Sequence, residues 1–286
     1  MNRIFIAISF AAAAWAQQTV PVEIRFKAMV GEEELVCGKS YRNIGTTAST
    51  VTPRDFRFYV SNVRLLDESG KETAVELKQD DKWQLDNVAL LDFENATGAC
   101  SNGTPETNHS IVGTVAGGGQ YRGIRFTLGV PFEKNHTDLT QMPPPLNLTA
   151  LAWVWNAGRK FARLDFSSTG APRGYAIHLG STGCTPSETK TTVPTSCSSP
   201  NRVDVEFAAF DPDKDVVVAD LGALLKDSNV DHTIPAMSGC MSSPTTAACG
   251  PIFANLGLPF PGQNSRPQAF FRKEFAASGP TVAAKE

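Results

Sequence analysis

Apolar and polar residues alternate along many short stretches of this chain, and this pattern constrains the fold more than any other feature. In residues 20–29 the apolar Ile24 and Phe26 alternate with the charged Arg25 and Lys27. Successive side chains of an extended strand point to opposite faces, so the pattern predicts a strand with one buried face. The same alternation predicts further strands at residues 55–66, 86–93, 123–130, 151–155, 161–166, 174–179 and 202–210.

Clusters of Gly, Pro, Asn and Asp separate these runs, and longer polar connections cover residues 96–119, 131–147 and 180–200. Helical periodicity is confined to a short segment at 219–226, with Asp220 near its start, and to a turn within 249–256. Short strands with regular turn signals are typical of sandwiches and barrels. We therefore predict an all-β fold, an antiparallel β-sandwich or barrel-like single domain over residues 17–275. We expect long disulfide-stapled loops and a flexible tail at 276–286.

The first residues of the chain have the pattern of a secretory signal. Arg3 supplies a positive charge, residues 4–14 are apolar, and residues 14–16 form a small-x-small cleavage site. This pattern predicts removal of residues 1–16 and a mature chain that begins near Gln17. No later stretch approaches the roughly 20 apolar residues needed to cross a bilayer. We therefore expect a periplasmic or secreted protein without a membrane span.

The charge balance excludes some classes of partner. The chain has 26 Lys and Arg against 29 Asp and Glu, which gives a formal net charge of −3. The charges are mixed along the chain and form neither the basic footprint of a nucleic-acid-binding protein nor a polybasic membrane patch. We expect no nucleic-acid partner.

Six cysteines lie in the predicted mature chain, and an even number in an exported protein favours disulfides. The alternative is metal ligation by thiolates. It is disfavoured because the sequence contains no C-x-x-C pair and because an oxidising compartment consumes free thiols. Six cysteines allow many connectivities, so local spacing gives a preference only. The preferred pairs are Cys184–Cys197, Cys240–Cys249 and Cys37–Cys100.

Two of the four histidines are candidate metal ligands. His136 follows a predicted strand, in a loop that the prolines at 143–145 stiffen, and His178 lies within a predicted strand. A neutral imidazole held rigidly is a good ligand for a borderline or soft metal, and in an exported protein this favours copper. The alternatives are an exposed turn histidine at 136 and a hydrogen-bonded core histidine at 178. His109 and His232 are weaker candidates.

Other residues could contribute to such a site. Met142, Met237 and Met241 could donate thioether sulfur to Cu(I), although each is more simply explained as packing. Trp153 and Trp155 are two residues apart and share one face of a strand. They could be core residues, a binding wall, or tryptophans oxidised beside a metal.

Signatures of common enzymes are missing from the sequence. It contains no G-x-S-x-G nucleophile motif, no H-E-x-x-H zinc motif and no P-loop. No nucleophile–base pair is visible either, so a hydrolase is the least favoured class. We expect a protein that is not an enzyme.

Several segments together resemble the MbnP-like periplasmic proteins, also described as the four-Cys member of the metallo-mystery pair. The segments are residues 121–132, 135–138, 145–147, 153–161, 178–184 and 239–242, and the resemblance spans nearly the whole mature chain. It implies a copper-associated protein, with Cu(I) or Cu(II), that acts with an MbnH-type dihaem c-type cytochrome related to bacterial peroxidases. That partner is expected to oxidise a tryptophan to kynurenine.

The resemblance also implies roles for particular residues. The four cysteines of the family name correspond to Cys184, Cys197, Cys240 and Cys249, as two disulfides. The metal ligands are expected among His136, His178 and His109. Trp153 or Trp155 is the expected site of oxidation, with Trp83 as the competitor.

This chain departs from the related methanotroph proteins in two places. Those proteins carry a ligand histidine two residues after the modified tryptophan. In this chain the residue two after Trp153 is Trp155, and the residue two after Trp155 is Ala157, so neither tryptophan has a histidine at that position. Arg159 stands where an aromatic residue is expected. The alternative function is a carbohydrate- or protein-binding β-sandwich, with Trp153 and Trp155 as a stacking platform and structural histidines.

Overall fold

A computed structural model describes residues 18–117, 119–153, 158–185, 193–232, 238–264 and 266–276. The predicted signal segment at 1–16 lies outside these residues, as do Trp155, Met237 and the tail beyond Ala276. No helix in the described part of the chain is both long and apolar enough for a membrane crossing.

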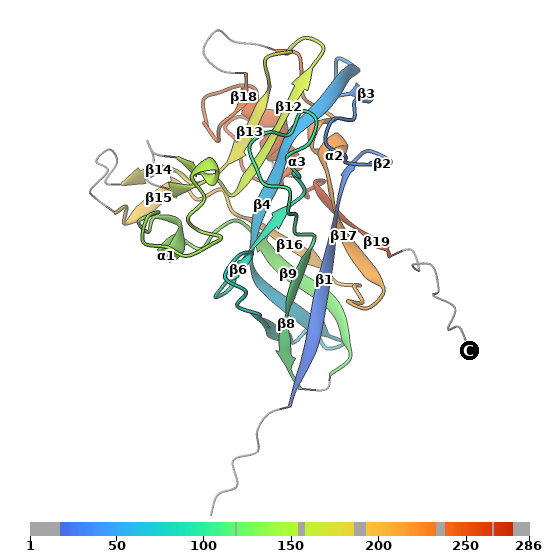
Figure 1. Cartoon of the computed structure of the whole chain (residues 1–286), viewed down its shortest axis with the longest axis vertical. Coiled ribbons are helices and arrows are strands. Elements are labelled where there is room, and N and C mark those ends of the chain that lie inside the picture. Colours follow the sequence, from blue (N-terminus) through green and yellow to red (C-terminus); the bar gives the residue numbers. More distant parts are fainter. Residues whose placement is uncertain are drawn as a thin grey trace, which may run out of the picture.

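One long strand, β4 (Ser49–Asp67), organises the sheet. It pairs antiparallel with β3 (Tyr41–Ile44), β5 (Glu72–Leu77), β7 (Val88–Asp92), β9 (Tyr121–Leu128) and β12 (Ala162–Ser168). A strand of 19 residues can hold this many partners because different sections of it pair with different neighbours. The sheet curls around these pairings, as Figure 1 shows.

The main strand order is β18-β13-β12-β4-β5-β8-β1-β17-β19. Most neighbours are antiparallel, while β1 with β17 and β13 with β18 are parallel. The mostly antiparallel all-β fold class predicted from the alternation is confirmed. The remaining strands are β1 (Thr19–Val30), β2 (Glu33–Glu34), β6 (Gln84–Leu85), β8 (Ser110–Ala116), β10 (Ala152–Trp153), β11 (Gly158–Arg159), β13 (Ala176–Leu179), β14 (Thr182–Thr185), β15 (Ser196–Ser199), β16 (Val203–Phe207), β17 (Asp215–Asp220), β18 (Gly239–Cys240) and β19 (Phe271–Phe275).

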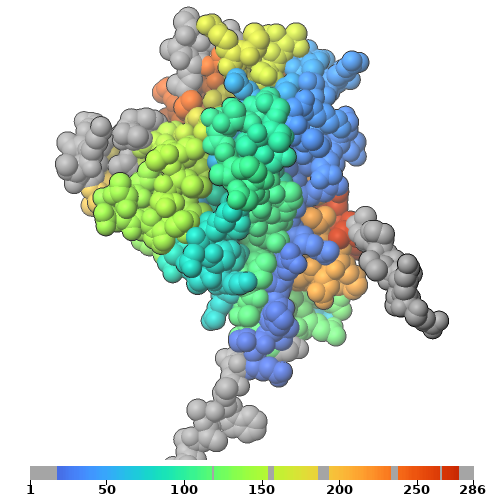
Figure 2. Space-filling view, in the orientation of Figure 1, coloured from blue at the N-terminus to red at the C-terminus, as the bar shows by residue number. Residues whose placement is uncertain are grey.

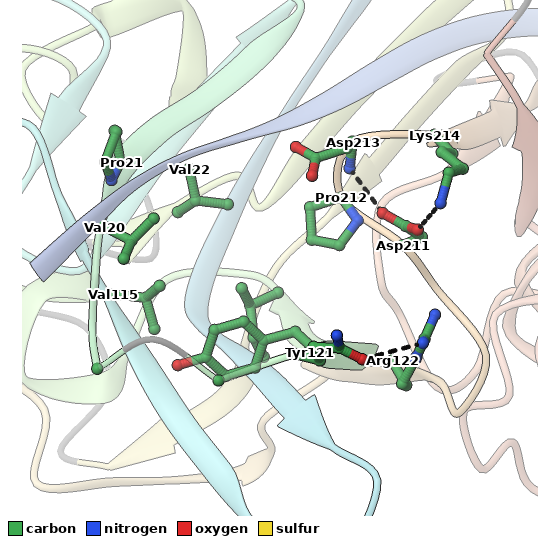
Figure 3. A pocket seen from close by; sticks show the side chains of 14 residues that line it. Val20, Pro21, Val22, Val115, Tyr121, Arg122, Asp211, Pro212, Asp213 and Lys214 are labelled. Atoms are coloured by element: carbon green, nitrogen blue, oxygen red, sulfur yellow. Dashed lines mark hydrogen bonds and ion pairs between the residues drawn. The ribbon is translucent and has the colours of Figure 1, made fainter.

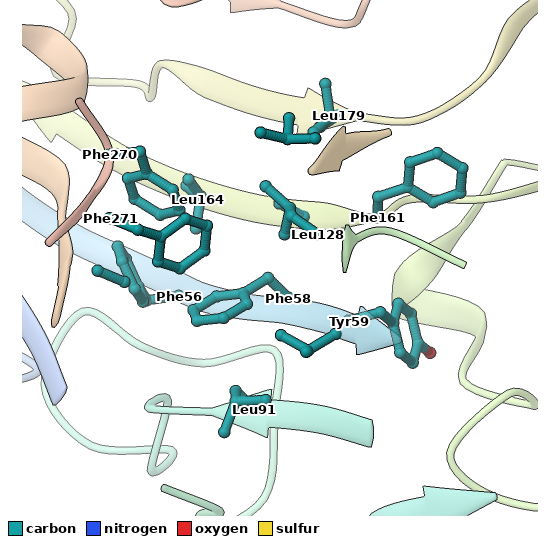
Figure 4. Close-up of a cluster of buried hydrophobic side chains, with 14 of the residues drawn as sticks. Phe56, Phe58, Tyr59, Leu91, Leu128, Phe161, Leu164, Leu179, Phe270 and Phe271 are labelled. Carbon is teal, nitrogen blue, oxygen red and sulfur yellow. The ribbon is translucent and has the colours of Figure 1, made fainter. Parts of the chain in front are cut away.

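Aromatic rings fill the inside of the curl. Phe56 and Phe58 on β4 are almost fully buried, and their rings lie about 6 Å from those of Phe93 and Phe270. Figure 4 shows Phe56 and Phe58 on β4 close to Phe270 from the C-terminal segment. Large aromatic side chains dominate the free energy of burial, at about 25 cal/mol for each Å² of apolar surface removed from water.

The predicted polar connection at 96–119 was wrong in its second half, which forms β8. Ile111 and Val115 on this strand are buried, while Val112 between them is 38% exposed. Ser, Gly and Thr occupy the other positions, so the sequence alternation is weak. The predicted connections at 131–147 and 180–200 also contain short elements, α1 (Phe132–Asn135) and the β14–β15 hairpin.

Helices are short and few in the described residues. The predicted helix at 219–226 is α2 (Leu221–Leu225), and the Asp220 side chain caps it by accepting a hydrogen bond from the Ala223 N–H at 3.1 Å. The predicted turn within 249–256 is α3 (Cys249–Asn255), and a 3₁₀ turn covers Thr149–Leu151.

Three disulfides join these elements, in the pairing that the sequence favoured. Cys37–Cys100 joins two loops, Cys184–Cys197 crosses the β14–β15 hairpin, and Cys240–Cys249 ties β18 to α3. Helix α1 and the β14–β15 hairpin lie side by side on one flank of the sheet (Figure 1), where the chain forms a lobe in Figure 2. The candidate site lies in this lobe.

Candidate metal centre

His136 follows α1 directly and its side chain faces the β14–β15 hairpin. The residue is 4% exposed. Its Nε2 atom lies 3.4 Å from Cys197 Sγ and 3.9 Å from Cys184 Sγ, the two sulfurs of the cross-strand disulfide. The alternative of an exposed turn histidine at position 136 is therefore wrong.

Hydrogen bonds define which ring nitrogen of His136 carries the lone pair. Asn135 Oδ1 accepts a hydrogen bond from the Arg159 backbone N–H at 2.8 Å, which fixes the orientation of the amide. Asn135 Nδ2 consequently faces His136 Nε2 at 3.0 Å. An amide nitrogen only donates, so Nε2 is the acceptor and the imidazole is neutral with its proton on Nδ1. A neutral imidazole of this kind is the form that binds metals.

Arg159 holds the loop that carries His136. The residue is 2% exposed. Its Nη1 donates to the carbonyl oxygens of Lys134 at 2.5 Å and Asn135 at 2.7 Å, and its Nε donates to Leu146 O at 2.8 Å. Burial lowers the pKa of this guanidinium. Where the resemblance led us to expect an aromatic residue, the chain therefore places a buried cation that clamps backbone carbonyls.

Two glycines allow the aromatic groups of the site to approach each other. Gly158 on β11 pairs with Trp153 on β10. A Cβ atom at Gly158 would lie 3.2 Å from Cε1 of His136, so the imidazole fills the space that a side chain would need. A Cβ at Gly180 would lie 2.5 Å from Trp153 Cζ3, so the indole packs on that backbone.

Trp153 and His136 are therefore both neighbours of Gly158. Trp153 is only 4% exposed. An exposed stacking platform needs open indole faces, so the buried Trp153 does not support that alternative. Trp83, the competing tryptophan, is half-buried with the Lys82 ammonium 4.9 Å from its ring centroid, away from any histidine contact that the structure describes.

His178 is buried on β13 in a different setting. Its Nε2 lies 2.9 Å from Asp165 Oδ1, and Arg163 Nε lies 2.8 Å from the other oxygen of that carboxylate. Burial alone would raise the pKa of Asp165, but the hydrogen bond with His178 and the nearby Arg163 guanidinium leave it lowered. Nδ1 of His178 is buried and has no partner among the described residues.

His109 and His232 lie in two further settings. The imidazole of His109 stacks on the Phe93 ring, with centroids 4.6 Å apart, and burial lowers its pKa. It lines a hollow of about 300 Å³ together with Cys37. His232 is exposed. Met142 and Met241 are half-buried.

The described residues contain one group of three side chains of His, Cys, Asp or Glu whose ligand atoms all lie within 4.8 Å of one another. Its members are His136, Cys184 and Cys197. The structure thus groups His136 with the sulfurs of a disulfide. His109 and His178 do not belong to this group. From the sequence we named His136, and Arg159 only as a departure from the family pattern, but we missed Asn135, Gly158 and the structural role of Arg159. No local signal identifies them, because their roles depend on contacts between separate segments.

A separate hollow of about 370 Å³ opens at the N-terminal end of β1 (Figure 3). Tyr121 and Arg122 face Pro212 and Asp213 across it, and its lining holds no histidine and no cysteine. It therefore offers no ligands for a soft metal.

The family model described as MbnP matches residues 19–242, which include all four histidines and five of the six cysteines. Among solved structures, MbnP from Methylosinus trichosporium is similar, with a TM-score of 0.78 and 30% sequence identity. The alignment covers 91% of this chain and 100% of that chain. No protein with a curated description matches this chain.

Proposed function

This chain belongs to the MbnP family, and from that premise we propose that it is an exported copper-binding protein without catalytic activity of its own. The observation that carries the proposal is the buried imidazole of His136, which accepts a hydrogen bond from Asn135 at Nε2 and faces the β14–β15 hairpin. Three disulfides support export, because such bonds persist in oxidising compartments.

The residues around His136 fit copper better than a hard cation. The neutral imidazole is a borderline donor, and no carboxylate belongs to the group of ligand atoms. Calcium and magnesium prefer oxygen ligands. Copper bound here would supply a centre able to change between Cu(I) and Cu(II).

His178 is the second proposed ligand, and its hydrogen bond supports the role. Asp165 accepts from Nε2 of His178, which leaves the lone pair on the buried Nδ1 without a partner among the described residues. Metal-bound histidines commonly donate their other ring nitrogen to a carboxylate in this way. His109 stays a possible third ligand.

We further propose that Trp153 is oxidised to kynurenine by an MbnH-type dihaem partner, as the resemblance implies. Its position next to Gly158, which His136 also neighbours, supports this role over that of Trp83. Because Trp153 is 4% exposed, direct contact with a partner's haem is unfavourable, and electron removal over a distance is required. Trp155 is the alternative target.

Copper analysis of the exported protein tests the metal assignment. Protein purified from a copper-supplemented periplasm should carry stoichiometric copper. The variants His136→Ala and His178→Ala should lose most of it while keeping their circular dichroism spectra. His232→Ala is the matched control, because His232 is exposed, and it should keep its copper. Unchanged copper in His136→Ala would overturn the assignment.

A further inference from the structure

We propose that the same centre has a second, thiolate form. When the Cys184–Cys197 disulfide is reduced, Nε2 of His136 and the two Sγ atoms become a three-ligand site for a soft cation such as Cu(I). The proposal rests on His136 as a copper ligand but adds two ligands and a redox condition to it.

The positions of the three ligand atoms support this site. Bonds of roughly 2.0 Å to nitrogen and 2.3 Å to sulfur place the ligand atoms of one ion roughly 3.5–4 Å apart. Nε2 of His136 is already 3.4 and 3.9 Å from the two sulfurs. Only the two sulfurs must separate, and they sit opposite each other on paired strands of the β14–β15 hairpin. Reduction therefore requires little rearrangement of His136.

The charges around the site favour an anionic metal complex. Cu(I) with two thiolates and a neutral imidazole has a charge of −1. The buried Arg159 guanidinium donates to the carbonyl oxygens of Lys134 and Asn135, directly before His136, and pairs with no carboxylate among the described residues. A buried cation without an anionic partner is costly, and a nearby anionic complex reduces that cost.

The redox step needs a dithiol reductant. A thiolate of the reductant attacks Cys197 Sγ, since Cys197 is half-exposed whereas Cys184 is buried. The second thiol of the reductant then attacks the mixed disulfide and releases the Cys197 thiol. The reductant leaves as its own disulfide. Two electrons and two protons have then passed to Cys184 and Cys197. Binding of Cu(I) displaces both protons and changes no oxidation state.

The other local disulfide provides a matched control. Cys240 and Cys249 are almost fully buried, and no histidine joins them in a group of ligand atoms within the described ranges. Reduction of this pair yields two thiols without an imidazole.

The test titrates Cu(I) into the full exported protein after reduction with dithiothreitol and anaerobic removal of the reductant. Wild type should acquire a thiolate-to-Cu(I) ultraviolet band that the oxidised protein lacks. The band should be absent from Cys184→Ser/Cys197→Ser and present in Cys240→Ser/Cys249→Ser. His136→Ala should weaken Cu(I) binding by roughly tenfold or more, since even an outer-shell partner is typically worth 10–100-fold.

Alkylation of the reduced wild type avoids any variant that fails to fold. Cu(I) should protect Cys184 and Cys197 from iodoacetamide and leave Cys240 and Cys249 reactive once the protein is denatured enough to expose them. Equal protection of all four, or a band that persists in Cys184→Ser/Cys197→Ser, would overturn the thiolate form. Copper binding by the oxidised protein is measured separately, so failure here leaves the assignment of His136 intact.

Discussion

The imidazole of His136 lies 3.4 Å from the sulfur of Cys197, so a buried histidine sits directly against a disulfide. The two residues are 61 positions apart in the sequence. Their contact joins the loop after β9 to the β14–β15 hairpin, and the proposed copper chemistry depends on this junction.

Gly158 should not tolerate a side chain. In Gly158→Ala the new Cβ would lie 3.2–3.3 Å from the His136 ring. Overpacking of this kind typically costs 1–3 kcal/mol, so we expect a decrease of about that size in the free energy of unfolding, and weaker copper binding. Chemical denaturation and copper titration measure the two effects. Gly119→Ala is the control, because its Cβ would meet nothing closer than 3.7 Å.

Loss of the Arg159 side chain should loosen the loop that carries His136. Arg159→Ala removes the donor to the carbonyl oxygens of Asn135 and Leu146, while Lys134 O keeps the hydroxyl of Thr137 as a donor. Each unsatisfied buried group costs about 1–3 kcal/mol, so the total loss in unfolding free energy should be roughly 2 kcal/mol or more. The exposed Arg173 gives the comparison, and an equal effect of Arg173→Ala would argue against a specific clamp.

One buried carboxyl group, that of Asp92, should make a contribution to stability that falls as the pH rises toward neutrality. Burial raises the pKa of Asp92 to about 7. In the unfolded chain this group loses its proton near pH 4, so between roughly pH 4 and 7 the folded state holds more protons. Its contribution to stability is therefore present at low pH and lost through this range. Asp92→Asn should flatten the pH dependence of urea unfolding, and an unaltered profile would contradict the assignment.

Coexpression with a dihaem peroxidase-like partner should convert Trp153 to kynurenine. Its burial next to Gly158, which His136 also neighbours, favours oxidation at this position. Peptide mass spectrometry would show the characteristic mass increase on the peptide that contains Trp153, with tandem spectra separating it from Trp155. Trp83→Phe should leave the modification unchanged. Modification confined to Trp83, or absent altogether, would remove the claim.

The alternation of residues predicted the principal strands well, because one buried face imposes a period of two. It missed β5 and β19, and it missed β17, whose six residues are all buried and so show no alternation. It also failed at β8, where Gly113 and Thr114 weaken the contrast between faces and Val112 is apolar yet exposed. At the site, the sequence named His136 because histidine is rare in this chain. The contacts with Cys184 and Cys197 and the burial of Arg159 depend on how separate segments pack, which local patterns do not encode.

The central claim is that copper binds to His136, and anomalous diffraction at the copper edge from crystals of the copper-loaded protein tests it most directly. We predict an anomalous peak roughly 2.0–2.1 Å from Nε2 of His136, the usual length of a bond between an imidazole nitrogen and a metal such as zinc. A copper peak elsewhere on the protein, with Asn135 still donating to Nε2 of His136, would contradict this claim.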